Sequence, residues 1–149
     1  MAIDETTERI IIEFLGKYEF DAMPWHVPFD AEAAQGIKPV DFMKKEYENV
    51  INDKQAELVD IIGPFDIIAV KNKNVYFFLV KKVENDMIHF ASEDEKETLL
   101  EAKKNKAKVY VMTNPYPEHL FKVYNVSMQS IKNMKINLNK CKEVDLSSL

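Results

Sequence analysis

An aspartate and a lysine at the two ends of a predicted β-hairpin are the residues best placed to do chemistry. Asp66 precedes the apolar run IIAV and Lys81 follows the run VYFFLV, with the turn-like segment KNKN between the two runs. Pairing of the runs would bring the carboxylate and the amine together. Such a pair at adjacent strand ends can hold a hydrated Mg²⁺ and orient water for attack on a phosphodiester. Both residue types are common at strand ends, so solvent-exposed flanks of a turn are the alternative interpretation.

Other catalytic and metal-binding patterns have little support in the sequence. The lone cysteine, Cys141, provides neither a disulfide framework nor a zinc site. Three glycines leave no phosphate-cradling loop, which excludes nucleotide hydrolysis of the P-loop type. The histidines lie in three different predicted elements without metal-ligand spacing: His26, His89 and His119. The serines near the C-terminus lie outside any nucleophile motif: Ser127 and Ser130.

Length and charge limit the class of protein. A chain of 149 residues, 46% of them hydrophobic, suits a single domain with a proper core. No apolar run approaches the roughly 20 residues of a membrane span, and the polar start MAIDETTERI lacks a signal-peptide pattern. We therefore expect a cytoplasmic protein that does not contact a membrane.

The net charge of −5 is unfavourable for binding a polyanion, but the charge is uneven. Residues 1–65 carry 6 basic and 14 acidic side chains, whereas residues 66–149 carry 14 and 11. Only Arg9 among the 20 basic residues is an arginine, so DNA contacts would be lysine point charges suited to shape rather than sequence. The lysines predicted to contact DNA lie in the second half: Lys71, Lys73, Lys82 and Lys104.

Hydrophobic periodicity predicts the elements that would position these residues. Helical spacing and caps predict four helices: 4–15, roughly 41–61, 93–105 and about 128–138. Short β-rich runs predict an edge strand, a hairpin and two further strands: within 18–29, 65–82, KVYVMT and LFKVYNVSM. The last segment, CKEVDLSSL, is predicted to fray. Hairpin and crossover connections together predict an α/β fold with a mixed sheet flanked by helices.

Four segments follow one another in an order typical of a known nuclease family. They are the helix TERIIIEFLGKYEF, the hairpin GPFDIIAVKNKNVYFFLVKK, the segment MIHFASEDEKETLLEAKKNKAKVYVMT and the strand LFKVYNVSM. In this order and spacing the chain resembles the PD-(D/E)xK nuclease superfamily and is most similar to the archaeal Holliday-junction resolvases. The likeness covers residues 64–128 and the first helix. It implies one restriction-endonuclease-like domain over residues 1–149, with an extra helical insertion at about 30–62.

The resemblance implies a three-part catalytic site, of which one part is missing here. It implies Asp66 on the first hairpin strand, a Glu-x-Lys on the second strand and Glu8 on the first helix, with Mg²⁺ as cofactor. With Lys81 as the lysine, the glutamate position falls on Leu79, and the next lysine in the chain gives a valine. An alkyl group cannot ligate a hard cation, so the sequence predicts an inactive or altered site.

A glutamate on the following helix offers a replacement. In some members of the superfamily the acidic ligand comes from that helix, and Glu97 is the candidate here, so that Asp66 and Glu97 would hold the metal. The alternative is that EDEKE is an ordinary, solvated first turn of a helix.

Two functions follow. The first is a resolvase-like protein that lacks nuclease activity or has an altered one, and that binds branched DNA or a protein partner as a homodimer. The second is an active Mg²⁺-dependent, structure-selective DNA endonuclease with its acid at Glu97. A homodimer suits the two-fold symmetry of a four-way junction. Leu79 and the net charge favour the first function, and the segment at 30–62 could carry a partner surface, a dimer contact or a plain structural insertion.

Overall fold

The computed structural model describes residues 5–24, 54–55, 57–58, 65–113, 121–131 and 134–149. Its two longer helices are α1 (Glu5–Gly16) and α5 (Glu93–Lys104). The strands are β1 (Asp21–Pro24), β2 (Ile67–Lys71), β3 (Asn74–Lys81), β4 (Met87–His89), β5 (Lys108–Thr113), β6 (Lys122–Asn125), β7 (Lys135–Asn137) and β8 (Lys142–Val144). Short 3₁₀ turns follow β6, β7 and β8: η2 (Met128–Ser130), η3 (Leu138–Lys140) and η4 (Leu146–Ser148).

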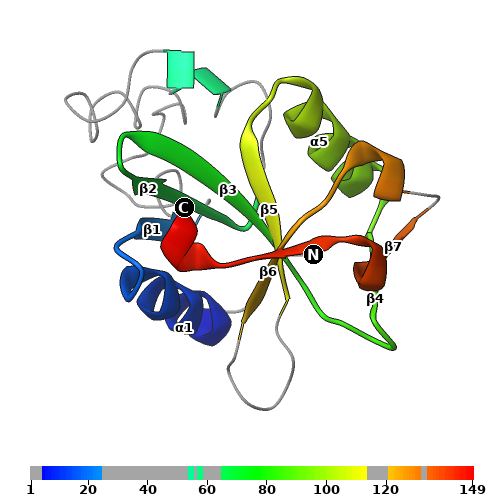
Figure 1. Ribbon diagram of the computed structural model, residues 1–149, viewed down its shortest axis with the longest axis horizontal. Coiled ribbons are helices and arrows are strands. Elements are labelled where there is room, and N and C mark those ends of the chain that lie inside the picture. Colours follow the sequence, from blue (N-terminus) through cyan, green and yellow to red (C-terminus); the bar gives the residue numbers. More distant parts are fainter. Residues whose placement is uncertain (1–4, 25–53, 56, 59–64, 114–120, 132–133) are drawn as a thin grey trace.

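Six of these strands form one mixed sheet in the order β1-β2-β3-β5-β6-β8. The β3–β5 pair is parallel, and the other neighbours are antiparallel. Strands β4 and β7 form a separate two-stranded antiparallel sheet. Helices α1 and α5 cover opposite faces of the large sheet (Figure 1). The predicted α/β fold with a mixed sheet flanked by helices is therefore confirmed.

Coverage of both faces explains the unbroken apolar sequence of β3. Val75, Phe77 and Leu79 belong to the cluster beneath α5, the α5-side cluster. Their neighbours on the strand, such as Phe78, belong to the cluster beneath α1, the α1-side cluster. Side chains alternate along a strand, so a strand buried on both faces must be apolar throughout.

The two helices begin and end close to the predicted residues. Helix α5 has Ser92 as its N-cap, whose hydroxyl accepts a hydrogen bond from the Glu95 backbone N–H at 3.2 Å. Its first turn is acidic and its last turn carries Lys103 and Lys104, both of which suit the helix dipole. The predicted hairpin, the edge strand at β1 and the strands β5 and β6 are also confirmed.

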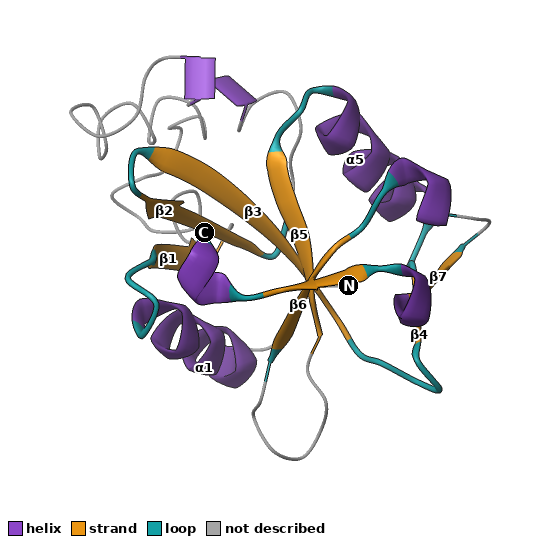
Figure 2. Ribbon diagram, viewed as in Figure 1, coloured by secondary structure: helices purple, strands orange, loops and turns teal. Residues whose placement is uncertain are grey.

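The predicted helix over about 128–138 is wrong. Its first residues form only the 3₁₀ turn η2, and residues 135–137 form β7, which pairs with β4 (Figure 2). In that register Ile136 lies opposite Ile88, and both belong to the α5-side cluster. Strand β4 was not predicted, because three residues are too few to show a periodicity.

The C-terminal segment does not fray as predicted. Strand β8 pairs with β6, and the following turn places Leu146 in the α1-side cluster with 5% of its surface exposed. A buried leucine and a strand ladder hold this segment in place.

The predicted helix over 41–61 and the insertion at 30–62 lie largely outside the described residues. Residues 54–55 and 57–58 are helical, and Gln55 Nε2 donates a hydrogen bond to the Lys73 carbonyl at 2.8 Å. Neither α1 nor α5, nor any other helix in the part of the chain that the structure describes, is long and apolar enough to cross a membrane.

Candidate functional site

Asp66 lies where the β2–β3 ladder ends. Its backbone N–H donates to the Phe78 carbonyl at 3.2 Å, and its Oδ2 accepts the backbone N–H of Val80 at 2.8 Å. The carboxylate thus takes an N–H of β3 at the point where β2 has no further residue to pair with it. Asp66 therefore has a structural role in addition to any chemical one.

Lys81, the last residue of β3, forms an ion pair with the first turn of α5. Its Nζ lies 2.6 Å from Glu95 Oε1, and the two side chains are 14% and 15% exposed. The same carboxylate oxygen accepts the backbone N–H of Ala91 at 3.0 Å. Glu95 therefore links the end of β3 to the loop before α5 and neutralises Lys81.

Burial and the nearby Glu95 change the acidity of Asp66. Burial raises the pKa of Asp66 above its usual value, and the negative charge of Glu95 raises it further. The Val80 hydrogen bond and the Lys81 charge act in the opposite direction but do not outweigh burial. Asp66, Lys81 and Glu95 therefore form one electrostatic group, which we call the Asp66 cluster.

The acid of α5 that lies in this cluster is Glu95, whereas Glu97, the residue proposed from the sequence as a metal ligand, lies outside it, and its role as a ligand stays a prediction. Glu95 lies on the same stripe of α5 as Leu99 and Ala102, which are buried against the sheet. Glu97 comes two residues later, about 200° around the helix axis, and is exposed. The spacing i, i+4, i+7 from Glu95 to the buried residues could have identified, from sequence, the glutamate on the side of α5 that faces the sheet.

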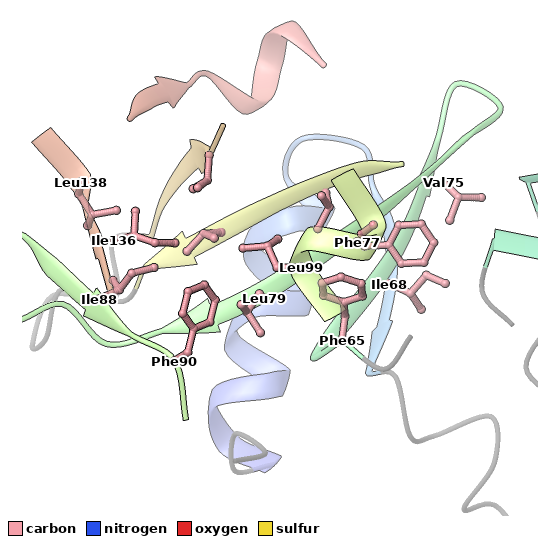
Figure 3. Close-up of a cluster of buried hydrophobic side chains, with 14 of the residues drawn as sticks. Phe65, Ile68, Val75, Phe77, Leu79, Ile88, Phe90, Leu99, Ile136 and Leu138 are labelled. Carbon is pink, nitrogen blue, oxygen red and sulfur yellow. The ribbon is translucent and has the colours of Figure 1, made fainter. Parts of the chain in front are cut away.

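Leu79, which stands where the resemblance implies a glutamate, is a core residue. It is 5% exposed and belongs to the α5-side cluster. Figure 3 shows Leu79 within that cluster, together with Phe65, Phe90 and Leu99. The position two residues before Lys81 therefore supplies packing to the core and no metal ligand.

Glu8 is placed on the other side of the sheet from α5. It lies on α1 with 5% of its surface exposed, three and seven residues before the buried Ile11 and Leu15. Those residues pack in the α1-side cluster. Glu8 therefore approaches the sheet from the face opposite Glu95, and its catalytic role stays a prediction.

The four lysines predicted to contact DNA differ in their surroundings. Lys71 is 8% exposed and its Nζ lies 4.8 Å from the centre of the Phe20 ring, so it is a packed residue and not a surface charge. The other three are exposed: Lys73, Lys82 and Lys104. Lys73 and Lys82 flank β3 and lie roughly 30 Å apart along the strand direction. They therefore form no single compact patch.

The residues present do not form the Mg²⁺ site that the resemblance implies. Mg²⁺ prefers an octahedral set of oxygen ligands that includes carboxylates. One oxygen of Asp66 is engaged by Val80, Glu95 Oε1 is engaged by Lys81 and Ala91, and Leu79 offers no oxygen. Within the described ranges, no group of three or more histidine, cysteine or acidic side chains is arranged to hold a metal ion.

Comparison with known proteins supports the fold. No family model matches the chain, and no curated protein matches it. Among solved structures, the chain is similar to Hjc, a Holliday junction resolvase from the archaeal hyperthermophile Archaeoglobus fulgidus. The TM-score is 0.50 at 17% sequence identity, over 93% of this chain and 89% of that chain. The sheet and its flanking helices thus have the restriction-endonuclease-like fold that was expected, while function must be argued from the site.

Proposed function

We propose that this chain is a resolvase-like protein that binds branched DNA as a homodimer and lacks the metal site needed to cleave it. The observation that carries the proposal is Leu79, a buried core residue at the position where a nuclease of this fold needs a carboxylate. The fold it shares with a Holliday junction resolvase supports branched DNA as the ligand.

The state of Lys81 supports the loss of cleavage. A lysine that polarises a water or a phosphodiester needs an ammonium group directed at the substrate. Here the ammonium is held by Glu95 at 2.6 Å and is largely buried. Asp66 retains a task in such a protein, because its carboxylate satisfies the Val80 N–H.

Binding and cleavage can be measured on the same labelled four-way junction. We expect fluorescence anisotropy to show saturable binding that weakens as salt rises, with weaker binding to a linear duplex of equal length. Denaturing gels should show no nicks with Mg²⁺ or Mn²⁺. Light scattering on the free protein should give the mass of a dimer. Absence of junction binding at low salt would contradict the proposal and favour a protein partner instead.

Restoring the missing carboxylate tests whether Leu79 is the reason for inactivity. We expect Leu79→Glu to gain Mn²⁺-dependent nicking of the junction. Leu79→Gln introduces a side chain of the same shape as glutamate but without its charge, and it should gain no nicking. Both variants place a polar group in the α5-side cluster, so both should unfold at lower temperature than the parent protein. Nicking by the unmodified chain would contradict the proposal that it lacks a metal site able to cleave DNA.

The second candidate is an Mg²⁺-dependent DNA endonuclease whose helical acid is Glu95. The observation in its favour is that Glu95 lies close enough to Asp66 to raise the pKa of Asp66. Mg²⁺ in proteins is commonly bound by one or two carboxylates together with substrate phosphates and water, so Asp66 and Glu95 could supply the protein ligands. This candidate requires the Lys81–Glu95 ion pair to open when metal and DNA bind.

Matched variants separate the two candidates. If the chain cleaves junctions, Asp66→Asn and Glu95→Gln should each abolish nicking, while Glu97→Gln should leave it unchanged because Glu97 lies on the solvent side of α5. If nicking survives Glu95→Gln and is lost in Glu97→Gln, the assignment of the helical acid to Glu95 is wrong.

A further inference from the structure

A hollow lies between the two-stranded sheet and the 3₁₀ turns η2 and η3. Its volume is about 500 Å³, which is within the range of small-ligand sites. None of its lining residues belongs to the Asp66 cluster. The hollow is therefore a feature separate from the site discussed above.

The register of β4 and β7 builds the floor of this hollow. Ile88 lies opposite Ile136, and both side chains point into the α5-side cluster. Because side chains alternate along a strand, the flanking residues point outward. On that outer face Met87 lies opposite Asn137, and Lys135 follows on the same face of β7.

The 3₁₀ turns supply donors around this floor. Ser127 and Ser130 come from the η2 turn, and their hydroxyl oxygens lie 2.8 Å apart, so one donates to the other. Gln129 lies between them in the chain, and Lys140 is the last residue of η3. Lys135 and Lys140 are exposed, and the ammonium group of neither makes an ion pair or hydrogen bond with the described part of the chain.

The charge of the lining has one sign. Among the described residues that line the hollow, two are lysines and none is acidic. Glu84 and Asp86 lie in the turn before β4, and the Asp86 carboxylate contacts Asn139 at 3.5 Å outside the lining. By contrast, a hollow of about 360 Å³ beside α1 and β8 includes Glu143 and Asp145 and so disfavours an anion.

We propose that this hollow is a phosphate-binding site. The ammonium groups of Lys135 and Lys140 would neutralise the phosphate charge, and the serine hydroxyls with the Gln129 and Asn137 amides would donate to its oxygens. The ligand class is a phosphate group, supplied either by a small phosphorylated molecule or by a nucleic-acid backbone. The site does not depend on the resolvase-like function proposed above.

The test is a titration of the ¹⁵N-labelled full chain with inorganic phosphate, followed by amide spectra. Sodium chloride at equal ionic strength is the reference. We expect saturable shifts at Ser127, Ser130, Lys135 and Lys140 that chloride does not cause. Lys135→Ala with Lys140→Ala should weaken phosphate binding by about tenfold or more, because charge-assisted hydrogen bonds are lost.

A charge-matched control removes two exposed lysines elsewhere, Lys17→Ala with Lys108→Ala, and should bind phosphate as the parent does. Spectra that superimpose away from the hollow would establish that both double variants are folded. A short duplex that shifts the same amides and competes with phosphate identifies a nucleic-acid source, and phosphate shifts without duplex shifts identify a small ligand. Shifts that do not saturate, or equal binding by the two double variants, would overturn the proposal.

Discussion

Replacing Asp66 by asparagine should stabilise the protein at neutral pH, whereas replacing it by alanine should not. The asparagine Oδ1 can still accept the Val80 N–H that Asp66 Oδ2 accepts at 2.8 Å. The substitution removes a carboxylate that is partly buried and close to Glu95, the two conditions that raise the pKa of Asp66. An ionised group in such surroundings costs free energy of folding, and a neutral amide does not carry that cost.

The size of the difference between the two variants follows from the Val80 hydrogen bond. Alanine leaves the N–H of a buried β3 residue without this acceptor, which costs about 1–3 kcal/mol. We therefore expect the free energy of unfolding of Asp66→Ala to lie about 1–3 kcal/mol below that of Asp66→Asn at pH 7. Both variants lack the charge, so the comparison isolates the hydrogen bond.

The pH dependence has a definite sign. The folded protein holds the Asp66 proton more tightly than the unfolded chain, whose carboxyl titrates near 3.8. The contribution of the Asp66 carboxyl to the free energy of unfolding is therefore fully present below pH 3.8 and is lost as the pH rises through the raised pKa of the folded state. The stability of the parent protein relative to Asp66→Asn should fall over that interval and then stay constant.

Urea unfolding followed by circular dichroism gives the required free energies for the three proteins across acidic and neutral pH. Subtracting the free energy of unfolding of Asp66→Asn from that of the parent protein at each pH cancels the contribution of the other carboxyl groups. The reasoning would be refuted if Asp66→Asn were less stable than the parent at pH 7, or if Asp66→Ala matched Asp66→Asn.

Three further predictions concern stability and DNA binding. Glu95→Gln should lower the free energy of unfolding by about 1–3 kcal/mol because Lys81 loses its partner. The control Glu97→Gln should change the free energy of unfolding by less than about 0.5 kcal/mol. Equal effects of the two substitutions in denaturant unfolding would contradict the assignment of Glu95 to the side of α5 that faces the sheet. Leu146→Ala should lower the free energy of unfolding by about 2–4 kcal/mol because it leaves a cavity in the α1-side cluster. Met128→Ala, at a side chain that is 48% exposed, should lower it by less than about 0.5 kcal/mol. A similarly small effect of Leu146→Ala would mean that the C-terminal segment frays. Lys82→Ala should reduce the log–log salt slope of junction binding by about 0.9 if Lys82 contacts one phosphate, and an unchanged slope would remove it from the DNA surface.

The elements with strong local signals could be predicted from sequence. The hairpin was clear because KNKN separates two apolar runs, and α5 was clear because Ser92 caps an acidic first turn. The helix predicted over about 128–138 was wrong because the apolar residues from Met128 to Leu138 recur at intervals compatible with a helix. That spacing arises instead from a 3₁₀ turn and a short strand that pairs with β4, a partner nearly fifty residues earlier. Such distant pairing leaves no mark on local periodicity.

The residues of the candidate site that depend on local sequence signals could be predicted, and those that depend on distant contacts could not. Asp66 and Lys81 were identified because a hairpin brings its ends together, and the structure places both near one helix. Which of Glu95 and Glu97 lies beside Lys81 depends on which side of α5 faces the sheet. The charged first turn alone does not indicate that side, but the apolar residues Leu99 and Ala102 further along the helix do. The structural role of Asp66 at the end of the ladder depends on where β2 stops, which composition does not specify.

The α1-side cluster joins segments from both ends of the sequence, and this has a consequence for how the protein folds during synthesis. Ile11 and Leu15 pack in the same cluster as Leu146, more than 130 residues later, whereas the α5-side cluster is built from residues 65–138. Closing a longer loop costs more chain entropy and slows folding. We therefore expect the α5 face to become protected first on the ribosome and the α1 face to remain open until residue 146 has emerged. Pulse-labelling hydrogen exchange on stalled nascent chains would test this order, and early protection of α1 would contradict it.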